Sequence, residues 1–423
     1  MMLFRDFIRK LEEIGILTLV DEEVNPDFEV ARRIHEQGEN PVMFTSVKGS
    51  KFPVAANICS NRKLLSIALG IEEGNVLKTI LSAIENPKPP ETTEKTGYME
   101  MDTNLDLLPV PKFYPTDGGR YITAGVVVCN DEEYGLNASY HRAMVIGKDR
   151  IVMRILPRDF HKYIERGNKR FLFCIGNPIP VIVSAAISVE IDKSELDIAN
   201  SLYPIRLMNF DGIPGPEAEI VMVCEITGEE HDEGPFVDIT QTLDIVRKQP
   251  VAEIKKIFVK KDAIFHAILP GGYEHRFVMG MPREATIYKE VSKVCDVVDV
   301  SLTPGGCSWL HGVVSIRKRH EDDGRKAIEY AFKGHKSMKH VFIVDDDIDI
   351  RDPSQLEWAM ATRFQGDRDM VIKREKGSSL DPSADPITRE TTKIGFDLTV
   401  PWGKDKRFFR RVTLQQISKD GNP

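Results

Sequence analysis

The stretch Asp232-Glu233-Gly234-Pro235-Phe236-Val237-Asp238 places two carboxylates, Glu233 and Asp238, on either side of a Gly-Pro pair. Glycine permits close backbone approach and proline fixes φ, so the segment between the acids is predicted to be a defined turn. Two acids held in a fixed relation, with different surroundings, are what acid–base chemistry requires. The alternative is an acid-rich surface turn, because further acids lie at positions 229–232.

The size and composition of the chain narrow its class. With 423 residues it is longer than a single core usually grows, so two or three domains are expected. Apolar residues make up 41% and charged residues 29%, as in soluble globular proteins. A formal charge of −8 argues against a nucleic-acid binder, which is usually basic. We expect neither a membrane span nor a signal peptide, since no apolar run is long enough and charges interrupt the N-terminus.

The cysteines indicate a reducing compartment. The six cysteines lie far apart, and most fall in apolar runs such as the one that ends at Cys129. This pattern predicts reduced, buried thiols in a cytoplasmic protein. No two cysteines have C-x-x-C spacing, so a zinc site built from cysteines is not expected.

Residue patterns divide the chain into three expected domains, at 1–100, 101–280 and 281–423. Helical apolar spacing followed by strand and helix patterns predicts a small α/β domain in the first. In the second, short strands recur between turn residues, which favours a barrel or a sandwich. Val181–Ala186 is one of these predicted strands.

The third region returns to alternating strand and helix patterns, which predicts an α/β domain. Pro282 is expected to start a helix that leads into Ala285–Val294. The last thirty or so residues are charged and weakly periodic. We expect this tail to pack across a subunit boundary or to be partly disordered.

Arg142 is a second candidate for chemistry, because it comes just before the predicted strand Ala143–Ile146. A buried arginine needs a carboxylate or phosphate partner, since an isolated buried charge is very costly. Two roles remain open at this point. Arg142 is either half of a core salt bridge or a clamp for a substrate carboxylate, which its planar fork suits.

Asn137, His161 and Glu195 are oxygen and nitrogen ligand types that together suit Mn²⁺ or Mg²⁺ bridging to a phosphate. Their spacing alone does not support a site, and the alternative is three solvated side chains. An acidic run at 345–349 begins like a calcium loop. However, Ile350 and Leu356 stand where the EF-hand needs Gly and Glu, so an acidic helix cap is the better interpretation.

Six motifs occur along the chain in a fixed order. They are Asn137-x4-Arg142, Glu233-Gly-Pro-Phe-x-Asp238, Pro304-Gly-Gly-Cys-Ser308, the acids Asp345, Asp346, Asp347 and Asp352, Trp358-Ala-Met-Ala-Thr-Arg363, and Lys393-Ile-Gly-Phe-Asp397. Together, in this order and at these separations, they resemble the UbiD family of reversible decarboxylases, which use prenylated flavin mononucleotide (prFMN). The resemblance extends over nearly the whole chain.

The resemblance implies a fold and a set of partners. The fold is α+β and multidomain, with an N-terminal α/β domain, a central split β-barrel like that of flavin reductases, and a C-terminal α/β oligomerisation domain. It implies that prFMN sits in the barrel, with its phosphate held through Mn²⁺ or Mg²⁺ and often K⁺. It also implies a homodimer or homohexamer, supplied with cofactor by a flavin prenyltransferase.

The resemblance also assigns metal ligands. Asn137 and Glu195 match two of them. The third falls in Arg154-Ile-Leu-Pro-Arg-Asp-Phe-His161, which can be aligned to place either Asp159 or His161 at the ligand position. Ligand type favours His161, and Asp159 remains a competitor.

Other residues resemble the family's cofactor contacts and catalytic groups. Lys393 matches the lysine that reaches the cofactor phosphate, and His141 and Arg142 are expected beside the cofactor together with Asn137. Arg142, Glu233 and Asp238 match the catalytic triad. Arg142 would orient the substrate carboxylate and pair with Glu233, while Asp238 would protonate the carbon that loses CO₂. Some members have Glu in the last position, so the shorter Asp238 changes the placement of the acid.

The substrate is a small carboxylic acid. Within the family the chain most resembles the archaeal members that convert trans-anhydromevalonate 5-phosphate to isopentenyl phosphate, and His141 and Arg283 are candidates to contact the substrate phosphate. One alternative is an aromatic acid decarboxylase of the 4-hydroxybenzoate or polyprenyl-4-hydroxybenzoate type. A non-catalytic flavin-binding subunit is the alternative of another class, and the presence of the complete triad argues against it.

Overall fold

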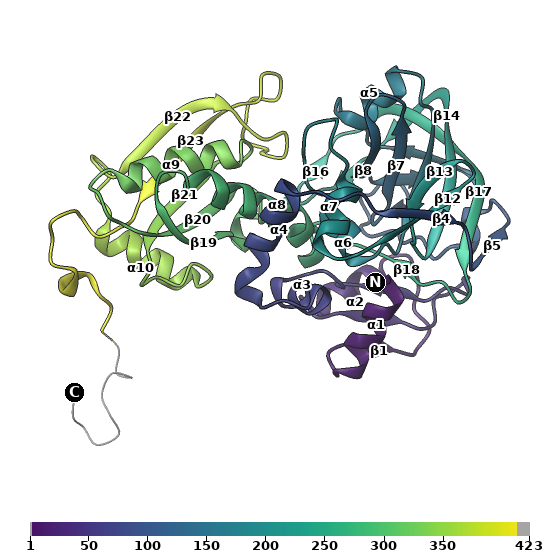
Figure 1. The fold of residues 1–423 in the computed structure, drawn as a ribbon, viewed down its shortest axis with the longest axis horizontal. Coiled ribbons are helices and arrows are strands. Elements are labelled where there is room, and N and C mark those ends of the chain that lie inside the picture. The colour runs from purple at the N-terminus through teal and green to yellow at the C-terminus, as the bar shows by residue number, and fades with distance from the viewer. Residues whose placement is uncertain (1, 413–423) are drawn as a thin grey trace. The chain divides into compact units, whose positions relative to one another are not determined.

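The computed structural model describes residues 2–412 (Figure 1). They form two compact units, one that ends at Pro282 and one that begins at Arg283. The boundary falls within α8 (Tyr273–Val291). Residues 413–423, the end of the predicted tail, lie outside the described residues, and the predicted boundary near residue 100 stays a prediction. None of the helices formed by residues 2–412 has the length and apolarity needed to cross a bilayer.

The N-terminal part of the first unit is a small sheet with helices around it. Its strands, in spatial order, are β1 (Thr18–Val20), β2 (Val42–Phe44), β3 (Val54–Ala56) and β18 (Phe265–His266). The helices are α1 (Phe4–Glu13), α2 (Glu29–Glu36), α3 (Arg62–Leu69) and α4 (Val76–Glu85). Because β18 comes from far along the chain and pairs with β3, this sheet is completed only by the rest of the unit.

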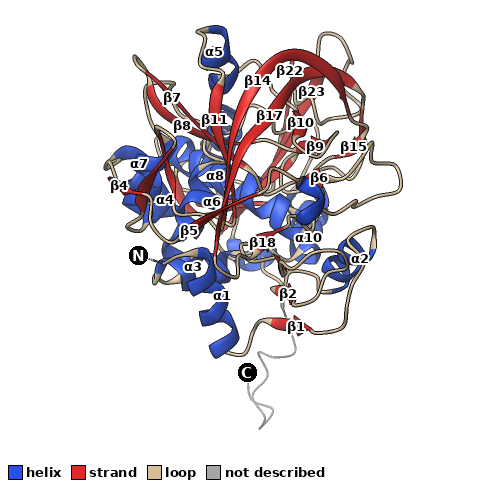
Figure 2. Ribbon diagram, turned by 90° about the vertical axis from the view of Figure 1, so that its right-hand side faces the viewer, coloured by secondary structure: helices blue, strands red, loops and turns tan. Residues whose placement is uncertain are grey.

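The centre of the first unit is a nine-stranded sheet, and the strand pairings within it are all antiparallel among the described residues. Along its main path the strands are β6 (Tyr121–Ile122), β9 (Ala143–Val145), β10 (Arg150–Met153), β17 (Arg247–Lys260), β14 (Ile220–Glu233), β11 (Arg170–Ile175), β7 (Val126–Asp131) and β8 (Gly135–Tyr140). β5 (Tyr98–Met101) pairs with β17 off this path. The 14-residue strands β14 and β17 arch across the unit in Figure 2.

The predicted split β-barrel is wrong. The path of the central sheet is open: β6 pairs only with β9 and β8 only with β7, so among the described residues the end strands do not meet. Short strands between turns occur in open sheets and in barrels alike. Closure depends on whether the first and last strands pair, and the local sequence pattern carries no information on that long-range contact.

Smaller elements flank the central sheet. One is a three-stranded sheet of β13 (Ile213–Pro216), β12 (Arg206–Phe210) and β4 (Glu91–Glu94). The other is a two-stranded ribbon of β15 (Phe236–Val237) and β16 (Leu243–Asp244). The helices are α5 (Asp159–Glu165), α6 (Ile179–Ser184) and α7 (Glu195–Leu202). The strand predicted at Val181–Ala186 is therefore wrong for its first part. A short, fully buried apolar run has no periodicity that separates strand from helix, and Pro180 at the first helical turn favours the helix.

The second unit contains a five-stranded mixed sheet. In spatial order its strands are β19 (Asp296–Leu302), β20 (His311–Arg317), β21 (His340–Asp345), β23 (Glu390–Asp397) and β22 (Met370–Lys376). Its helices are α9 (Asp323–Gly334) and α10 (Pro353–Arg363). The helix predicted to start at Pro282 begins earlier, at Tyr273, and Pro282 lies inside it. Residues 2–412 also form four 3₁₀ turns: η1 (Glu73–Asn75), η2 (Leu105–Leu107), η3 (Pro304–Gly306) and η4 (Lys406–Phe409).

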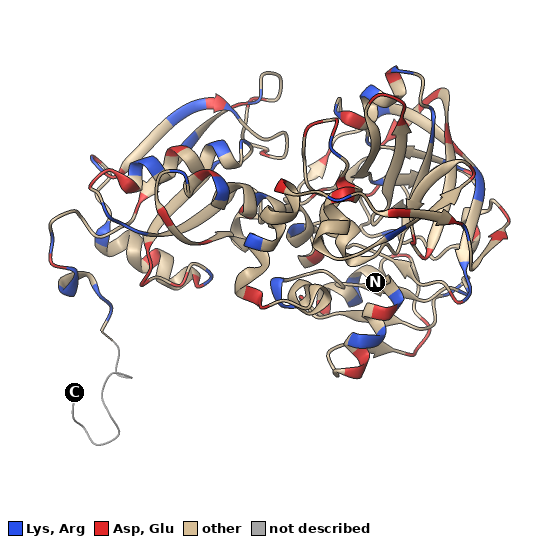
Figure 3. Ribbon diagram, in the orientation of Figure 1, with Lys and Arg blue, Asp and Glu red and all other residues tan. Residues whose placement is uncertain are grey.

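One apolar core explains why the first unit is a single body. The cluster that contains Val42 and Phe44 of the small sheet continues into Tyr121, Phe173 and Met222 of the central sheet. Burial of such side chains contributes about 1.5–3 kcal/mol each, so the two sheets stabilise one another. Acidic and basic residues are interspersed along the chain in both units (Figure 3).

Candidate active site

The two longest strands of the first unit determine where Glu233 and Asp238 lie. β14 ends at Glu233, and β17 begins at Arg247, its partner in the antiparallel register. Between them the chain forms a second, smaller ribbon in which Phe236 of β15 pairs with Asp244 of β16. The residues from 234 to 246 therefore form an insert at the tip of the long hairpin.

The structure brings Arg142, Glu233 and Asp238 together. Nε and Nη2 of Arg142 donate to the two oxygens of Glu233 at 2.8 and 3.0 Å, a bidentate pair. Nη1 of Arg142 donates to Oδ2 of Asp238 at 2.9 Å. A third acid, Asp244, accepts a bond from Nη2 of Arg142 at 2.8 Å. Sequence reasoning missed Asp244, whose only local signal is its position opposite Phe236 in the small ribbon.

The three acids differ in their surroundings. Glu233 is fully buried and also accepts a bond from the hydroxyl of Tyr121 at 3.3 Å. Asp244 also accepts bonds from Arg247 Nη1 and the backbone of Ile245. Asp238 accepts only two bonds, from Arg142 and from the backbone N–H of Ile239. Asp238 is therefore the acid with the fewest donors.

Charge pairing dominates the electrostatics of Arg142. Burial alone lowers the pKa of Arg142, but the hydrogen bonds and charges of Glu233, Asp238 and Asp244 raise it above its ordinary value. The pKa of Asp244 is lowered, because its bonds to Arg142 and Arg247 outweigh the effect of burial. The guanidinium of Arg142 lies over the ring of Phe236, 4.4 Å from its centroid. Phe236, which lies between Glu233 and Asp238 in the sequence, thus packs against the guanidinium of Arg142.

Backbone contacts hold the insert against the sheet. Asp117 accepts bonds from the N–H groups of Tyr114 and Val237, and Gly118 N–H donates to the carbonyl of Pro235 at 2.8 Å. A Cβ on Gly118 would overlap the carbonyl oxygen of Gly234. The residue at 118 must therefore be glycine for the turn to lie where it does. Burial raises the pKa of Asp117.

Two further residues missed from the sequence lie near this cluster. His275, in the first turn of α8, accepts a bond at Nδ1 from the backbone of Gly271, which fixes its tautomer. Burial lowers the pKa of His275; the charge of Asp238 opposes this and that of Arg142 reinforces it. Arg154 follows β10 and donates its backbone N–H to the carbonyl of Arg142 at 3.3 Å. Neither residue belongs to a motif that spacing alone reveals.

The structure brings together part of the predicted metal site. Nδ2 of Asn137 donates to Oε2 of Glu195 at 3.1 Å, and the N–H of Ala138 donates to the same oxygen. Glu195 is 3% exposed, and burial raises its pKa to about 8, with the charge of Asp159 acting in the same direction. Within residues 2–412, no three His, Cys, Asp or Glu side chains gather in a metal-binding group.

His161 and Asp159, the two candidates for the third metal ligand, have different surroundings. His161 contacts Glu165 one helical turn away, with 3.4 Å between Nδ1 and Oε2, and its side chain is 39% exposed. The charge of Asp159, by contrast, affects the buried groups Glu195 and Tyr163. Asp159 is thus the residue on the Glu195 side of α5.

The remaining predicted cofactor contacts have different settings. His141 is half-buried, with Nδ1 next to the Arg154 carbonyl at 3.0 Å and Nε2 next to the hydroxyl of Ser139, which in turn donates to Asn137. Burial lowers the pKa of His141 to about 4. Lys393 lies in the second unit, 2% exposed, and its ammonium donates to the carbonyl of Lys336.

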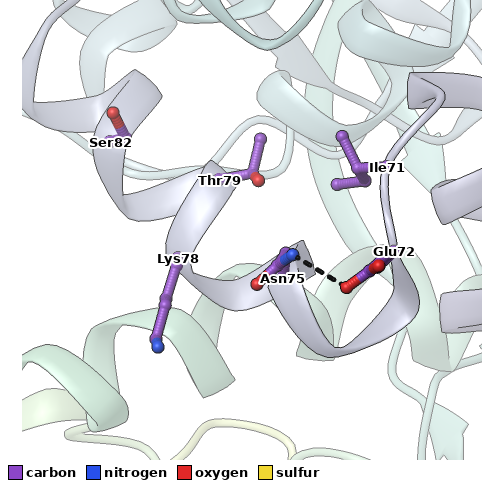
Figure 4. Close-up of a pocket in the computed structure, with 6 residues that line it drawn as sticks. All are labelled: Ile71, Glu72, Asn75, Lys78, Thr79 and Ser82. Atoms are coloured by element: carbon purple, nitrogen blue, oxygen red, sulfur yellow. Dashed lines mark hydrogen bonds between the residues drawn. The ribbon is translucent and has the colours of Figure 1, made fainter.

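A surface depression of about 440 Å³ lies on the first unit beside α4, and none of these residues lines it (Figure 4). Its lining comes from the turn and helix at 71–82, and Asn75 bonds to Glu72 across it. It contains no acid–base pair and no buried charge. The Arg142 cluster is therefore the better candidate for catalysis.

Comparison with known proteins gives one family along the chain. Residues 8–84, 84–273 and 276–398 match the N-terminal, Rift-related and C-terminal domains of 3-octaprenyl-4-hydroxybenzoate carboxy-lyase. Anhydromevalonate phosphate decarboxylase of Methanothermobacter thermautotrophicus is 39% identical over 420 residues, which cover 96% of this chain and 99% of that protein.

Solved structures agree with this result. The UbiD-class enzyme HmfF from Pelotomaculum thermopropionicum, in complex with FMN, is 32% identical, with a TM-score of 0.93 over 98% of both chains. An evolved dimeric form of HmfF in complex with prFMN is 30% identical, with a TM-score of 0.90 over 99% of this chain and 98% of that one. The family resemblance expected from the six motifs is confirmed. The chain is a member of the UbiD family of carboxy-lyases.

Proposed function

We propose that the protein is a prFMN-dependent decarboxylase that converts trans-anhydromevalonate 5-phosphate to isopentenyl phosphate and CO₂. Near-full-length similarity to the Methanothermobacter thermautotrophicus anhydromevalonate phosphate decarboxylase supports the substrate. The similarity to HmfF, solved with FMN and in an evolved form with prFMN, supports the cofactor.

The observation that carries the chemistry is the unequal sharing of Arg142 by three acids. Glu233 and Asp244 each accept three hydrogen bonds. Asp238 accepts two, so its oxygens have the most free acceptor capacity of the three acids, and we assign Asp238 as the proton donor. An acid that gains and loses a proton beside a fixed cation is what a decarboxylase needs.

The reaction balances with one proton. The bond between the carboxylate carbon and C2 of the substrate breaks, CO₂ leaves, and the electron pair stays on C2. Asp238 then gives its proton to C2, and it regains one from solvent, since its side chain is 18% exposed. When bound, prFMN supplies the electron sink that makes loss of CO₂ from an unsaturated acid feasible. Arg142 holds Asp238 in place throughout.

The donor set around Glu195 suits a divalent metal. Burial raises the pKa of the Glu195 carboxylate, and the charge of Asp159 raises it further, so a cation at this place would stabilise the ionised form. We propose that Asn137, Glu195 and Asp159 hold Mn²⁺ or Mg²⁺ at the cofactor phosphate, because oxygen ligands suit these ions. Asp159 takes the place predicted for His161. K⁺ belongs to the same proposal.

The proposal extends to assembly and location. We infer a homo-oligomer, a flavin prenyltransferase as the supplier of prFMN, and a cytoplasmic location. The six cysteines are free, four of them buried, which supports a reducing compartment.

The test is co-expression with a flavin prenyltransferase, followed by assays of CO₂ release from a panel of acids. We expect turnover of trans-anhydromevalonate 5-phosphate, with isopentenyl phosphate as product, and none of 4-hydroxybenzoate. Turnover of 4-hydroxybenzoate alone would replace the proposed substrate by an aromatic acid. A flavin-loaded protein that releases CO₂ from no acid in the panel would contradict the decarboxylase assignment.

A further inference from the structure

The helix α5, which carries both candidates for the third metal ligand, has little support of its own. It has seven residues, and helices shorter than about 12–15 residues are marginal in water. Among the residues that the structure describes, the charged side chains of α5 pair only with one another, His161 with Glu165 and Lys162 with Asp159. The polar contacts that attach this helix to the sheet must therefore come from residues beyond its ends.

Two aromatic side chains attach α5 through its inner face. Phe160 packs against Phe171 of β11, with 5.2 Å between the ring centroids, and Tyr163 stacks on Tyr134 at 6.2 Å. Phe160 and Tyr163 are both buried, and they are three positions apart, so they lie on one face of the helix. Apolar burial is non-directional, so these contacts stabilise α5 without fixing how it is oriented.

Arg166, which follows the last residue of α5, makes the directional contact. Its Nε donates to Oδ2 of Asp131 at 2.9 Å, and its Nη2 lies 2.8 Å from Oε2 of Glu133. Its guanidinium lies over the ring of Tyr134, 4.8 Å from the centroid. Asn168 donates to the same Oδ2 of Asp131 at 2.6 Å. The C-terminal end of α5 is thus bound to the turn between β7 and β8.

Asp131 joins these two segments with a single carboxylate. Its Oδ1 accepts the N–H groups of Glu133 and Tyr134, at 2.9 and 3.1 Å, which fixes the turn. Its Oδ2 accepts the bonds from Arg166 and Asn168. The bond from Arg166, more than any other contact, lowers the pKa of Asp131. Asp131 is buried, and a buried carboxylate is costly without such donors.

The turn leads directly to the proposed metal site. Asn137 is the third residue of β8 and pairs with Cys129 of β7. Burial raises the pKa of Cys129, and the charges of Glu195, Asp131 and Asp159 act in the same direction. These acids therefore lie around the same part of the β7–β8 hairpin as Asn137. Asn137 and Glu195 are joined by a hydrogen bond, whereas within residues 2–412 Asp159 bonds to neither.

We propose that Asp131 and Arg166 are positioning residues for the divalent metal, because they hold α5 against the β7–β8 hairpin so that its ligand reaches the ion. The inference rests on the proposed metal site, but not on whether Asp159 or His161 supplies the ligand, since both lie on α5. Without the pair the aromatic contacts remain, but α5 loses its fixed orientation. The metal then loses a protein ligand, and the flavin phosphate that it holds is retained less well.

The experiment measures how much free Mn²⁺ the holoenzyme needs to keep its metal. Holoenzyme is dialysed against a series of free Mn²⁺ concentrations, and bound manganese and flavin absorbance are measured. The variants are Asp131→Asn, Arg166→Gln and both together. Asparagine keeps an oxygen for the backbone bonds of the turn and presents an NH₂ group to Arg166, so it breaks the contact with the end of α5. The control is Arg170→Gln, which removes an exposed arginine that pairs with Asp211.

We expect the Mn²⁺ concentration at half-occupancy to rise by about ten-fold or more in Asp131→Asn and in Arg166→Gln, because each loses the ionic hydrogen bond that orients the ligand. The double variant should match the weaker single variant, since the two residues act as one pair. At low Mn²⁺, amide hydrogen exchange at residues 159–166 should be faster than in wild type. Saturating Mn²⁺ should restore metal and flavin, and Arg170→Gln should match wild type throughout.

Three results would overturn the inference. A wild-type Mn²⁺ requirement in both single variants would show that α5 delivers its ligand without the pair. Metal loss that excess Mn²⁺ does not restore, with faster exchange throughout β7 and β8, would mean that the pair stabilises the hairpin instead. Equal weakening in Arg170→Gln would mean that loss of any nearby cation has this effect. Wild-type protein that retains flavin without a divalent ion contradicts the proposed metal site itself, and the inference then fails with that site.

Discussion

At the scale of single residues, the site is a competition among three carboxylates for one guanidinium. Glu233 accepts two bonds from the Nε–Nη2 edge of Arg142 and one from the Tyr121 hydroxyl, so it is the permanent counter-ion of the arginine. Asp244 is shared with Arg247. Asp238 alone has one donor on each oxygen. The different roles of Glu233, Asp238 and Asp244 thus follow from the number of hydrogen bonds that each carboxylate accepts.

Asp238→Asn should abolish proton delivery. We expect turnover to fall by at least about 100-fold, because an amide cannot supply the proton, while flavin content stays at the wild-type level. Exchange of the terminal =CH₂ hydrogens of isopentenyl phosphate, which lie on the carbon that lost CO₂, with solvent deuterium, followed by NMR, should stop. The control, Asp244→Asn, leaves Asp238 in place and should retain exchange. Wild-type exchange in Asp238→Asn would show that another group carries the proton.

Glu195→Gln should weaken metal binding and, through it, cofactor retention. The neutral amide removes one of the two acids proposed as ligands, so bound metal and flavin should both fall after gel filtration. Metal analysis and visible absorbance measure this without an activity assay. Asp197→Asn, on the same helix and outside the cluster, is the matched control. Full metal and flavin occupancy in Glu195→Gln would exclude the proposed ligand set.

At the scale of elements, the site depends on how the β14–β17 hairpin tip meets the segment around Gly118. The carbonyl of Pro235 accepts the Gly118 N–H, and Asp117 fixes the backbone of Val237. These two contacts determine where Asp238 lies relative to Arg142. The geometry of the acids is therefore set from outside the hairpin.

Gly118→Ala should damage catalysis without touching a catalytic group. The added methyl overlaps the Gly234 carbonyl, so the insert must shift, and a displacement of even an ångström costs roughly 100-fold in rate. We expect kcat to drop and the melting temperature to fall modestly. Gly147→Ala, whose Cβ would make only ordinary contacts with Arg150, is the control. Equal kcat in the two variants would show that the contact at 118 does not position the site.

The sequence predicted local features of this site better than its distant contacts. The Gly-Pro turn and the partnership of Arg142 with an acid follow from residue types, because a buried charge demands a partner. Asp244 and Arg154 could not be found in this way, since their positions depend on strand register between segments up to about a hundred residues apart. For the same reason the open central sheet was mistaken for a barrel. The error at α6 is local, because a short buried apolar run has no periodicity that separates strand from helix.

At the scale of the whole molecule, the two units offer separate observables. The three tryptophans are Trp309, Trp358 and Trp402, all in the second unit. Their fluorescence therefore reports unfolding of that unit alone. The second unit also holds His335, which is 3% exposed and stands with one ring nitrogen at the carbonyl of Trp309.

The second unit should lose stability as pH falls. Burial lowers the pKa of His335 to about 3, and the charge of Arg283 adds to this. In the unfolded chain a histidine titrates near pH 6.5, so below that pH the unfolded state binds a proton that the folded state refuses. The stabilisation is complete above about pH 6.5 and is lost as pH falls toward 3. At pH 5 the loss from His335 is about 2 kcal/mol.

Urea unfolding followed by tryptophan fluorescence at pH 7 and pH 5 measures this loss. In His335→Gln the pH dependence should shrink by about 2 kcal/mol, since glutamine does not titrate and can still donate to Trp309. The exposed His320→Gln should behave like wild type. Identical pH dependence in His335→Gln and wild type would mean that His335 is not the source.

The insert at 234–246 has a consequence for the evolution and redesign of substrate range. It lies between two strands locked by their ladder, and it carries Asp238 and Asp244 but neither Arg142 nor the groups around Glu195. The segment can therefore be exchanged for another of equal length without changing the β14–β17 ladder. A segment with Glu at position 238 would place the proton donor about one methylene further from the backbone, so the protein could accept acids of a different shape while the fold stays the same.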